Sequence, residues 1–315
     1  MAAFNLTPSG PSIFVLNGIP GLEDEHIHVW ISIPFCLIYV ISILGNVVIL
    51  VIIKTDPTLH EPMYILLSML AITDLGLSIS TLPTILGIFL FNSREINSDA
   101  CFAQLFFIHS LTFTESSVLL SMAFDRFVAI CNPLRYESIL TPPRIVKMGL
   151  VSLLRGVGVT FPVPILLKHF RYCHANILSH SYCLNQEVMK MACSDIRAHS
   201  IYSFFVTLAS LGLDILFILL SYVMILKTVL SIASHMERLK ALNTCVSHIC
   251  VVLLFYTPEI SLSVIHRFVK NPSPLVEIVL GNVYLLVPPL MNPIVYSVKT
   301  KSIQVRIIRF CHRQD

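Results

Sequence analysis

The sequence predicts an all-α membrane protein, a seven-transmembrane helix bundle with a short amphipathic cytoplasmic helix after the last span. Composition is the first observation: 55% of the 315 residues are hydrophobic and 12% are charged, about half the charged fraction of a soluble domain. The second observation is that apolar stretches of a length that crosses a bilayer as a helix recur along the chain. They lie near 29–53, 63–91, 101–131, 145–167, 199–230, 241–265 and 275–297.

The stretches leave only short loops, so we expect residues 1–315 to form a single seven-transmembrane domain with tails at 1–28 and 298–315. No basic, apolar and small-residue pattern of a cleaved signal peptide opens the chain. The net charge of +3 is too small to indicate nucleic-acid binding. No internal repeat is visible, which disfavours transporter architectures built from paired halves. Asn5 begins an N-glycosylation triplet, Asn5-Leu6-Thr7, which suits an extracellular tail.

The distribution of Lys and Arg predicts the orientation in the membrane. With the amino terminus outside, the cytoplasmic segments hold 13 Lys and Arg residues and the outer segments hold 7. This predicts an extracellular amino terminus and a cytoplasmic carboxyl terminus, with membrane lipid as a partner. Residues 299–313 alternate basic and apolar side chains, which is typical of a helix lying on the anionic inner leaflet.

The stretch MAFDRFVAIC, residues 122–131, contains an Asp-Arg pair in a run that is otherwise apolar or small. A charged pair there is costly to bury unless it is paired and held for a purpose. Pro133 restricts the residue before it and lacks an N–H, so the helix ends near it. Asp125 and Arg126 therefore lie in the last turns of a spanning helix. Taken alone, the pair is either an ordinary boundary ion pair or a switch.

The wider motif MAFDRFVAICNPLRY resembles the odorant (olfactory) receptors of the rhodopsin-like G-protein-coupled receptor family. Other family motifs are Gly45-Asn46, LHEPMYILLSMLAITDL at 59–75, Ser221-Tyr222, KALNTCVSH at 240–248 and PLMNPIVY at 289–296. IPGLED and FFIHSLTFTES are similar to the fish-like class (class I). The resemblance covers essentially the whole chain. It implies a plasma-membrane receptor, not an enzyme, that binds a small-molecule odorant and activates a stimulatory, olfactory-type G protein, which raises cyclic AMP.

The resemblance also implies which residues respond to the ligand on the cytoplasmic side. They are Asp125, Arg126, Tyr222, Asn292, Pro293 and Tyr296. In this arrangement Arg126, held by Asp125, is released toward the G protein when the helices shift. Pro258 removes a backbone hydrogen bond and gives the sixth span a point to bend. The chain departs from the family at Phe124 and Phe127, where tyrosines are usual, so hydrogen bonds from those hydroxyls are absent.

Two carboxylates lie deep in spans and should share a proton or a cation, because unpaired charges there are expensive. They are Asp74 and Glu115, and the resemblance implies that both are near Asn46 and Asn292. A structural sodium ion and a protonated, hydrogen-bonded pair are the two alternatives. An ion-coupled transporter would use the same carboxylates as a relay. A non-olfactory chemosensory receptor for a small metabolite would share the fold.

The family pattern implies two disulfides on the oxidising, extracellular side. They are Cys101–Cys183, which ties the third span to the second outer loop, and Cys173–Cys193 within that loop. A metal site that includes His174 and His180 is the alternative.

The resemblance implies a ligand pocket between the outer halves of spans three, five, six and seven. Its candidate residues are His109, Thr112, Phe113, Gln186, Tyr256, Glu259, Ser263 and Arg267. Arg267 can form a bidentate pair with a carboxylate, and the fish-like class favours carboxylic acids and other polar odorants. Arg267 as a solvated loop charge and His109 as a packed core histidine are the alternatives. Glu259 would repel an acid unless it is protonated or paired, and it suits hydroxyl or amine groups, so the ligand's charge stays open.

Overall fold

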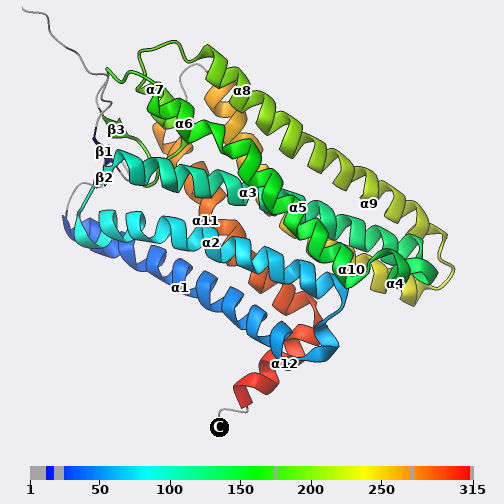
Figure 1. Cartoon of the computed structure of the whole chain (residues 1–315). Helices are drawn as coiled ribbons and strands as arrows, with labels where there is room; N and C mark the ends of the chain where they lie inside the picture. The colour runs from blue at the N-terminus through cyan, green and yellow to red at the C-terminus, as the bar shows by residue number, and fades with distance from the viewer. Residues whose placement is uncertain (1–11, 18–24, 174–175, 270–272, 313–315) are drawn as a thin grey trace, which may run out of the picture.

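The structure is a computed structural model that describes residues 12–17, 25–173, 176–269 and 273–312. Within these residues, seven helical segments are long and apolar enough to cross a membrane, which confirms the predicted bundle. Figure 1 shows them running side by side along one direction. The segments are α1 (Glu25–Thr55), α2 (Pro62–Phe91), α3 (Ser98–Cys131), α5 with α6 (Pro142–Thr160 and Pro162–Lys168), α8 with α9 (Arg197–Thr207 and Leu213–Ser231), α10 (His235–Phe268) and α11 (Pro274–Lys299).

Several helices begin where the sequence satisfies or removes the first backbone donors. Pro62 and Pro142 occupy the first positions of α2 and α5, where a missing N–H is not needed. The Asn97 side chain accepts a hydrogen bond from the backbone N–H of Asp99 at the start of α3. The Ser234 hydroxyl does the same for Glu237 at the start of α10. These local signals fix the ends of the spans.

Two of the spanning segments are interrupted in their outer halves. The fourth span changes from α5 to α6 at Phe161, immediately before Pro162, which has no N–H to continue the ladder. The fifth span contains a π-helical turn, Leu208–Gly212, between α8 and α9. A π-helical turn is wider than an α-helical turn, so some of its carbonyl groups leave the regular hydrogen-bond pattern of the helix. Such turns are frequent at functional sites. Pro258 lies inside α10, in the sixth span, where the sequence predicts it.

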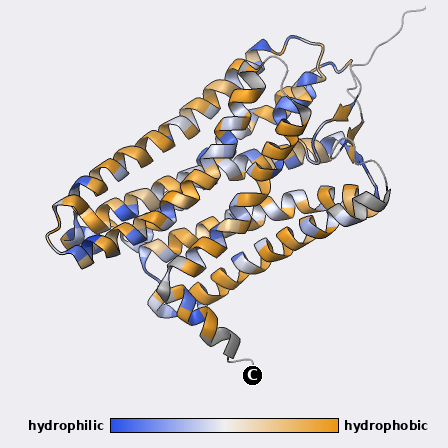
Figure 2. Cartoon of the chain, turned by 180° about the vertical axis from the view of Figure 1, so that it is seen from behind, coloured by the Kyte–Doolittle hydropathy of each residue, from blue (hydrophilic) through white to orange (hydrophobic). Residues whose placement is uncertain are grey.

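The third span is the central helix of the bundle. In the most apolar 18-residue stretch of α3, 72% is buried inside the bundle. The corresponding share is 28% in both the fourth and the fifth spans. Many large apolar side chains of the other helices are exposed, which suits contact with lipid tails. Figure 2 shows that hydrophobic residues make up most of the length of these helices. α1 and α11 approach closely at Gly45, because a Cβ there would lie 3.0 Å from Pro293.

A small three-stranded sheet covers the end of the bundle that the sequence predicts to be extracellular, opposite to α12 (Figure 1). Its central strand is β1 (Ile13–Leu16), which pairs antiparallel with β2 (Glu95–Asn97) and parallel with β3 (Ile177–Leu178). Phe14 in β1 is fully buried and lies edge-on to Phe102 of α3. The amino-terminal segment therefore joins the outer core, which its sequence did not predict.

Short elements and the amphipathic helix lie at the other end of the bundle, which the sequence predicts to be cytoplasmic. They are η1 (Pro57–Leu59), η2 (Pro133–Arg135), α4 (Tyr136–Ile139) and α12 (Lys301–His312). α12 confirms the predicted helix after the last span. Its Arg306 forms an ion pair with Asp56 and donates to the Thr58 hydroxyl, which ties α12 to the loop after α1. Ile303 of α12 is fully buried against the bundle.

Candidate functional site

A small cavity lies in the outer half of the bundle, where six elements meet. The volume of this cavity that the centre of a water molecule can occupy is about 30 Å³. α3, α5, α6, α8 and α10 supply its walls, together with α7 (Asn185–Lys190) of the second outer loop. The lining residues are His109, Thr112, Phe113, Val159, Thr160, Val163, Asn185, Gln186, Tyr202, Ser203, Val206, Thr207 and Glu259. This mixture of apolar side chains and placed polar groups is typical of small-molecule sites.

Five of the eight predicted ligand residues line this cavity. They are His109, Thr112, Phe113, Gln186 and Glu259. α3 carries three of them on one face, because positions 109, 112 and 113 are spaced by about one helical turn.

The other three predicted ligand residues lie elsewhere. Tyr256 is deeper in the bundle, 2% exposed, and bonds to Ser116 rather than facing the cavity. Ser263 lies on α10 but is not part of the lining. The side chain of Arg267 lies outside the described residues, so its role as a carboxylate partner remains a prediction.

The sequence did not predict the wall that the fourth span supplies. Val159, Thr160 and Val163 line the cavity from α5 and α6, on either side of the interruption at Phe161. The Tyr202 hydroxyl of α8 donates to the Val159 carbonyl at 2.9 Å, which bridges the fourth and fifth spans. The proline after Phe161 was the available signal, because it marks where backbone groups become free for such contacts.

Most polar groups of the lining already have partners in the wall. The Thr112 and Tyr284 hydroxyls lie 2.6 Å apart. The Asn185 amide donates to the Ser203 hydroxyl at 3.0 Å, and its oxygen lies 2.8 Å from His199. His109 differs, because its Nε2 is buried and has no hydrogen-bond partner among the described residues.

The second outer loop is fixed above the cavity by covalent and polar contacts. Cys101 and Cys183 form a disulfide between α3 and the loop, and the Cys183 N–H donates to the Gln104 side chain at 2.9 Å. The Tyr182 hydroxyl donates to the Gly281 carbonyl of α11 at 2.6 Å. Burial raises the pKa of Tyr182, which keeps that hydroxyl a donor.

Both disulfides that the resemblance implies are present, the second joining Cys173 to Cys193. For the alternative metal site, the four cysteines are not available as ligands, because their sulfur atoms are joined in disulfides. His174 lies outside the described residues. His180 contacts Glu187 at 3.9 Å and the Glu277 carbonyl at 3.3 Å. In the part of the chain that the structure describes, no group of three His, Cys, Asp or Glu side chains is arranged to hold a metal ion.

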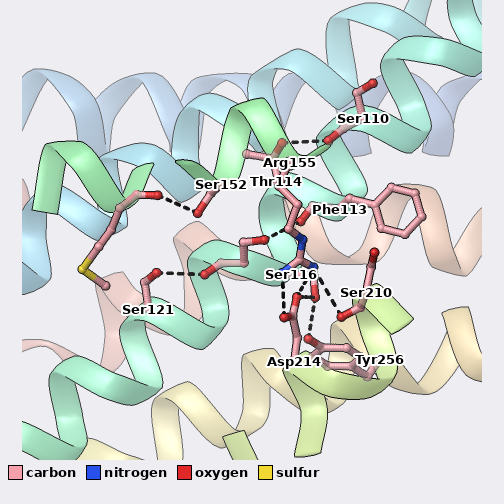
Figure 3. Close-up of polar contacts among 12 residues, drawn as sticks. Ser110, Phe113, Thr114, Ser116, Ser121, Ser152, Arg155, Ser210, Asp214 and Tyr256 are labelled. Atoms are coloured by element: carbon pink, nitrogen blue, oxygen red, sulfur yellow. Dashed lines mark hydrogen bonds and ion pairs between the residues drawn. The ribbon is translucent and has the colours of Figure 1, made fainter. Parts of the chain in front are cut away.

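A buried ion pair lies directly below the cavity, and Figure 3 shows the side chains that meet there. Two nitrogens of Arg155 donate to the two carboxylate oxygens of Asp214, at 2.8 and 2.6 Å. The Ser116 hydroxyl donates to Asp214 at 2.7 Å and lies 2.7 Å from the Tyr256 hydroxyl. Arg155 also donates to the Ser210 carbonyl, which the π-helical turn of the fifth span presents. Spans three, four, five and six are thus joined by one polar network.

This network was not predicted from the sequence, although the opposite charges in two apolar spans were a signal for it. Arg155 and Asp214 are 59 residues apart, so spacing gives no indication of their contact. Gly156 helps to place Arg155, because a Cβ there would collide with the Ser110 carbonyl of α3. The glycine therefore lets α5 pack against the α3 backbone.

The two predicted deep carboxylates share one amide. Asn292 Nδ2 lies 3.1 Å from both carboxylate oxygens of Asp74 and 3.4 Å from Glu115. Asn46 does not join them, because its amide donates to the carbonyls of Ser42 and Pro289. The expected group of four is therefore a group of three, with Asn46 instead stabilising the contact between α1 and α11.

The cytoplasmic residues of the predicted switch lie in two groups. Arg126 lies 3.6 Å from Asp125, which also accepts a hydrogen bond from Tyr136 at 2.8 Å. The Tyr222 hydroxyl lies 2.6 Å from His248, which links the fifth and sixth spans. The pair at the end of α3 is thus held by Tyr136 of α4, and its role as a switch stays a prediction.

The remaining switch residues lie on α11. The Tyr296 hydroxyl contacts the Met122 sulfur of α3 at 3.9 Å. Pro293 packs against α1 at Gly45. Asn5, the predicted glycosylation position, lies outside the described residues.

Comparisons with known proteins agree on one family. The family model described as "Olfactory receptor" matches residues 35–314. Human olfactory receptor 51G2 is 64% identical over 309 residues, covering 98% of both chains. Human olfactory receptor 51A4 is 58% identical over 315 residues, covering 100% of both chains. Human olfactory receptor 51L1 is 56% identical over 308 residues, covering 98% of this chain and 97% of the relative.

Proposed function

The chain belongs to the olfactory receptor family, and we propose that it binds a small polar odorant in the outer cavity and activates a stimulatory G protein. The family is one of rhodopsin-like, multi-pass plasma-membrane receptors that bind odorants and couple to G proteins, and it is not enzymatic. We propose further that the odorant is polar, that the G protein is of the stimulatory type and raises cyclic AMP, and that the amino terminus is extracellular.

One observation carries the proposal: the cavity and the buried network share α10. Glu259 lines the cavity, and Tyr256, three residues earlier on the same helix, bonds to Ser116. A ligand that contacts Glu259 therefore acts one helical turn from a bond between spans three and six. Such a ligand can shift the equilibrium between two arrangements of α10 only if it binds one of them better.

The cytoplasmic end offers the matching response. His248 and Tyr222 link α10 to α9, close to the charge of Arg126. Movement of α10 would break this link and leave Arg126 available to a partner. The excess of Lys and Arg in the loops on this side supports its placement in the cytoplasm.

The test is ligand-driven cyclic AMP in cells that display the receptor at their surface. We expect at least one member of a broad panel of small polar odorants to raise cyclic AMP. Arg126→Ala should abolish the response while surface display is kept. Silence to the whole panel from well-displayed receptor would contradict the proposal, and so would substrate flux into liposomes without any G protein.

We also propose a sodium ion at the deep carboxylates. Asp74 and Glu115 supply hard oxygen ligands, and Glu115 Oε2 and Asn292 Oδ1 have no hydrogen-bond partner among the described residues. This donor set fits a small cation that neutralises two nearby negative charges. Sodium chloride should raise the melting temperature of purified receptor more than choline chloride does, and Asp74→Asn should remove the difference. An equal effect of both salts on the unaltered receptor would leave the protonated pair as the explanation.

A further inference from the structure

A chain of hydrogen bonds joins the second outer loop to the fifth span beside the cavity. Nδ2 of Asn185 in α7 donates to the Ser203 hydroxyl at 3.0 Å, and Oδ1 of Asn185 lies 2.8 Å from Nε2 of His199. His199 and Ser203 are four residues apart on α8, so they lie on one face of that helix. Asn185 and Ser203 also line the cavity. The direction of these bonds therefore decides which polar atoms the wall offers to a ligand.

The tautomer of His199 sets that direction. The residue is 3% exposed, and its Nδ1 is buried without a hydrogen-bond partner in the part of the chain that the structure describes. Buried N–H groups without an acceptor are rarer in proteins than acceptors without a donor, so the imidazole proton belongs on Nε2. Nε2 then donates to Oδ1 of Asn185, which leaves Nδ2 of Asn185 to donate to Ser203.

Ser203 thus receives a hydrogen bond and keeps its own hydrogen for another partner. Within the described residues, its hydroxyl is the acceptor of the Asn185 bond and donates to no other group. Thr207, one turn later, differs because its hydroxyl donates to the Ser203 backbone carbonyl at 2.8 Å. A hydroxyl that already accepts a bond is a better donor, because hydrogen bonds in a chain polarise one another. The wall of the fifth span therefore presents a donor to the cavity.

A second unpaired hydroxyl lies on the wall that the fourth span supplies. Thr160 lines the cavity at the end of α5 and is 1% exposed, and its Oγ1 has no hydrogen-bond partner among the described residues. The residues next to the two hydroxyls are bonded to each other, since the Tyr202 hydroxyl donates to the Val159 carbonyl at 2.9 Å. Ser203 and Thr160 therefore lie on adjoining walls of one small cavity. Buried polar groups in proteins are almost always paired, so two unpaired donors here point to an acceptor on the ligand.

We infer that spans four and five form a subsite for a carbonyl oxygen, bound by the hydroxyls of Ser203 and Thr160. This inference rests on the proposed function and names the ligand class of the same cavity, which is small ketones. A carbonyl oxygen has two lone pairs, so it can accept both bonds. The alkyl chain of the ketone would contact the apolar part of the lining, which includes Phe113, Val163 and Val206.

Other head groups satisfy this subsite less well. An ammonium has donors alone and cannot accept from either hydroxyl. An alcohol adds a third O–H hydrogen to two that already need an acceptor, and Thr160 is not bonded to Ser203. A carboxylate can accept both bonds, but its burial is costly unless a cation pairs with it. Glu259 lines the same cavity and takes part in an interaction of its own, so the subsite is built without it.

The experiment compares two series of the same shape, 2-alkanones and 2-methyl-1-alkenes, in which a methylene group replaces the carbonyl oxygen. Binding is measured as thermal stabilisation of the purified receptor, and signalling as cyclic AMP in cells that display it. The ketones should stabilise the receptor at concentrations at least about tenfold lower than the alkenes, because an alkene leaves two buried donors unpaired. The two readouts separate binding from coupling.

Variants at the two hydroxyls locate the subsite. Ser203→Ala and Thr160→Val each remove one donor with little change of volume, so each should weaken the ketones about fivefold without weakening the alkenes. Thr160→Ser keeps the hydroxyl and should keep the ketone affinity. Ser152→Ala is the matched control, because it removes a buried hydroxyl of the same helix that donates to the Met148 carbonyl, outside the cavity.

Asn185→Asp tests the direction of the hydrogen-bond chain. An aspartate has almost the same shape as asparagine but only acceptor oxygens, so the Ser203 hydroxyl would donate to it and no longer to the ligand. His199 would keep its partner. The variant should therefore weaken the ketones about as much as Ser203→Ala does.

The outcomes distinguish this inference from the proposed function. Ketones and alkenes that stabilise the receptor at equal concentrations would overturn the inference, and so would ketones that act equally well on Ser203→Ala and Asn185→Asp. Failure of the ketones to stabilise the purified receptor would overturn it too, while a cyclic AMP response to other odorants would leave the proposed function standing. Ketones that depend on Ser203 for binding but raise no cyclic AMP would support the inference and count against the proposed coupling.

Discussion

Removing the positive partner of the buried ion pair should destabilise the receptor strongly. In Arg155→Met, the Asp214 side chain, only 3% exposed, loses both of its charge-assisted hydrogen bonds from the guanidinium. Breaking one side of a buried pair costs about 3–5 kcal/mol, because the remaining charge is left without compensation. We expect a loss of free energy of unfolding in this range.

The reverse change should cost about as much. In Asp214→Asn the uncompensated charge is that of Arg155, whose side chain is 31% exposed but which lies at the middle of the spanning segment Pro142–Lys168, far from either polar interface. We therefore expect a similar loss of about 3–5 kcal/mol. The double variant, which leaves no buried charge, should recover part of the stability lost in Arg155→Met.

The assay is thermal and denaturant unfolding of purified receptor in detergent. Lys147→Met is the control, because it also replaces a basic side chain by methionine, at an exposed position of the same helix. The reasoning is refuted if Arg155→Met unfolds at the same temperature as the control, or if the double variant is less stable than Arg155→Met. The first result would mean that the contact contributes no net stabilisation. The second would mean that the uncompensated charge of Asp214 is not what destabilises Arg155→Met.

Three further predictions concern the two ends of the bundle. Phe127→Tyr restores the hydroxyl usual in the family at a half-buried position near the cytoplasmic end; it should change basal cyclic AMP, and equal basal and maximal signals would contradict this. Hydrogen bonds from Thr58 and from Arg306 lower the pKa of Asp56 from 3.8 to about 2. A lowered pKa stabilises the docking of α12 above pH 3.8 and ceases to do so as the pH falls toward 2, so amide exchange in α12 should rise over that range and Asp56→Asn should remove the change. Cys101→Ser opens a disulfide that spans 82 residues and should cost about 4.5 kcal/mol in denaturant unfolding, and an unchanged midpoint would show that the bond adds nothing.

Patterns that are local in the chain predicted much of the fold. The seven spans follow from runs of apolar residues, and the helix after the last span follows from alternating basic and apolar residues. The resemblance supplied both disulfides and five of the lining residues. In each case the signal lies in neighbouring residues or in a family motif.

Contacts between distant parts of the chain could not be predicted in this way. Nothing near Asp214 in sequence indicates that it meets Arg155, and nothing near Phe14 indicates a strand that pairs with two outer loops. For Asn46 the family motif predicted a contact that the structure does not have. Its amide donates to the carbonyls of Ser42 and Pro289 and not to the deep carboxylates. Such contacts depend on which faces the packed helices present to one another.

The buried network contains one bond that differs in kind from the rest. Asp214 holds Arg155 and Ser116 by charge-assisted bonds, and these link spans three, four and five. Tyr256 joins through a bond between two neutral hydroxyls, which contributes only about 1 kcal/mol net. Breaking that bond separates α10 from the network without separating a buried ion pair. Spans three, four and five can therefore stay as one rigid unit while α10 moves, which places the movable joint directly below Glu259.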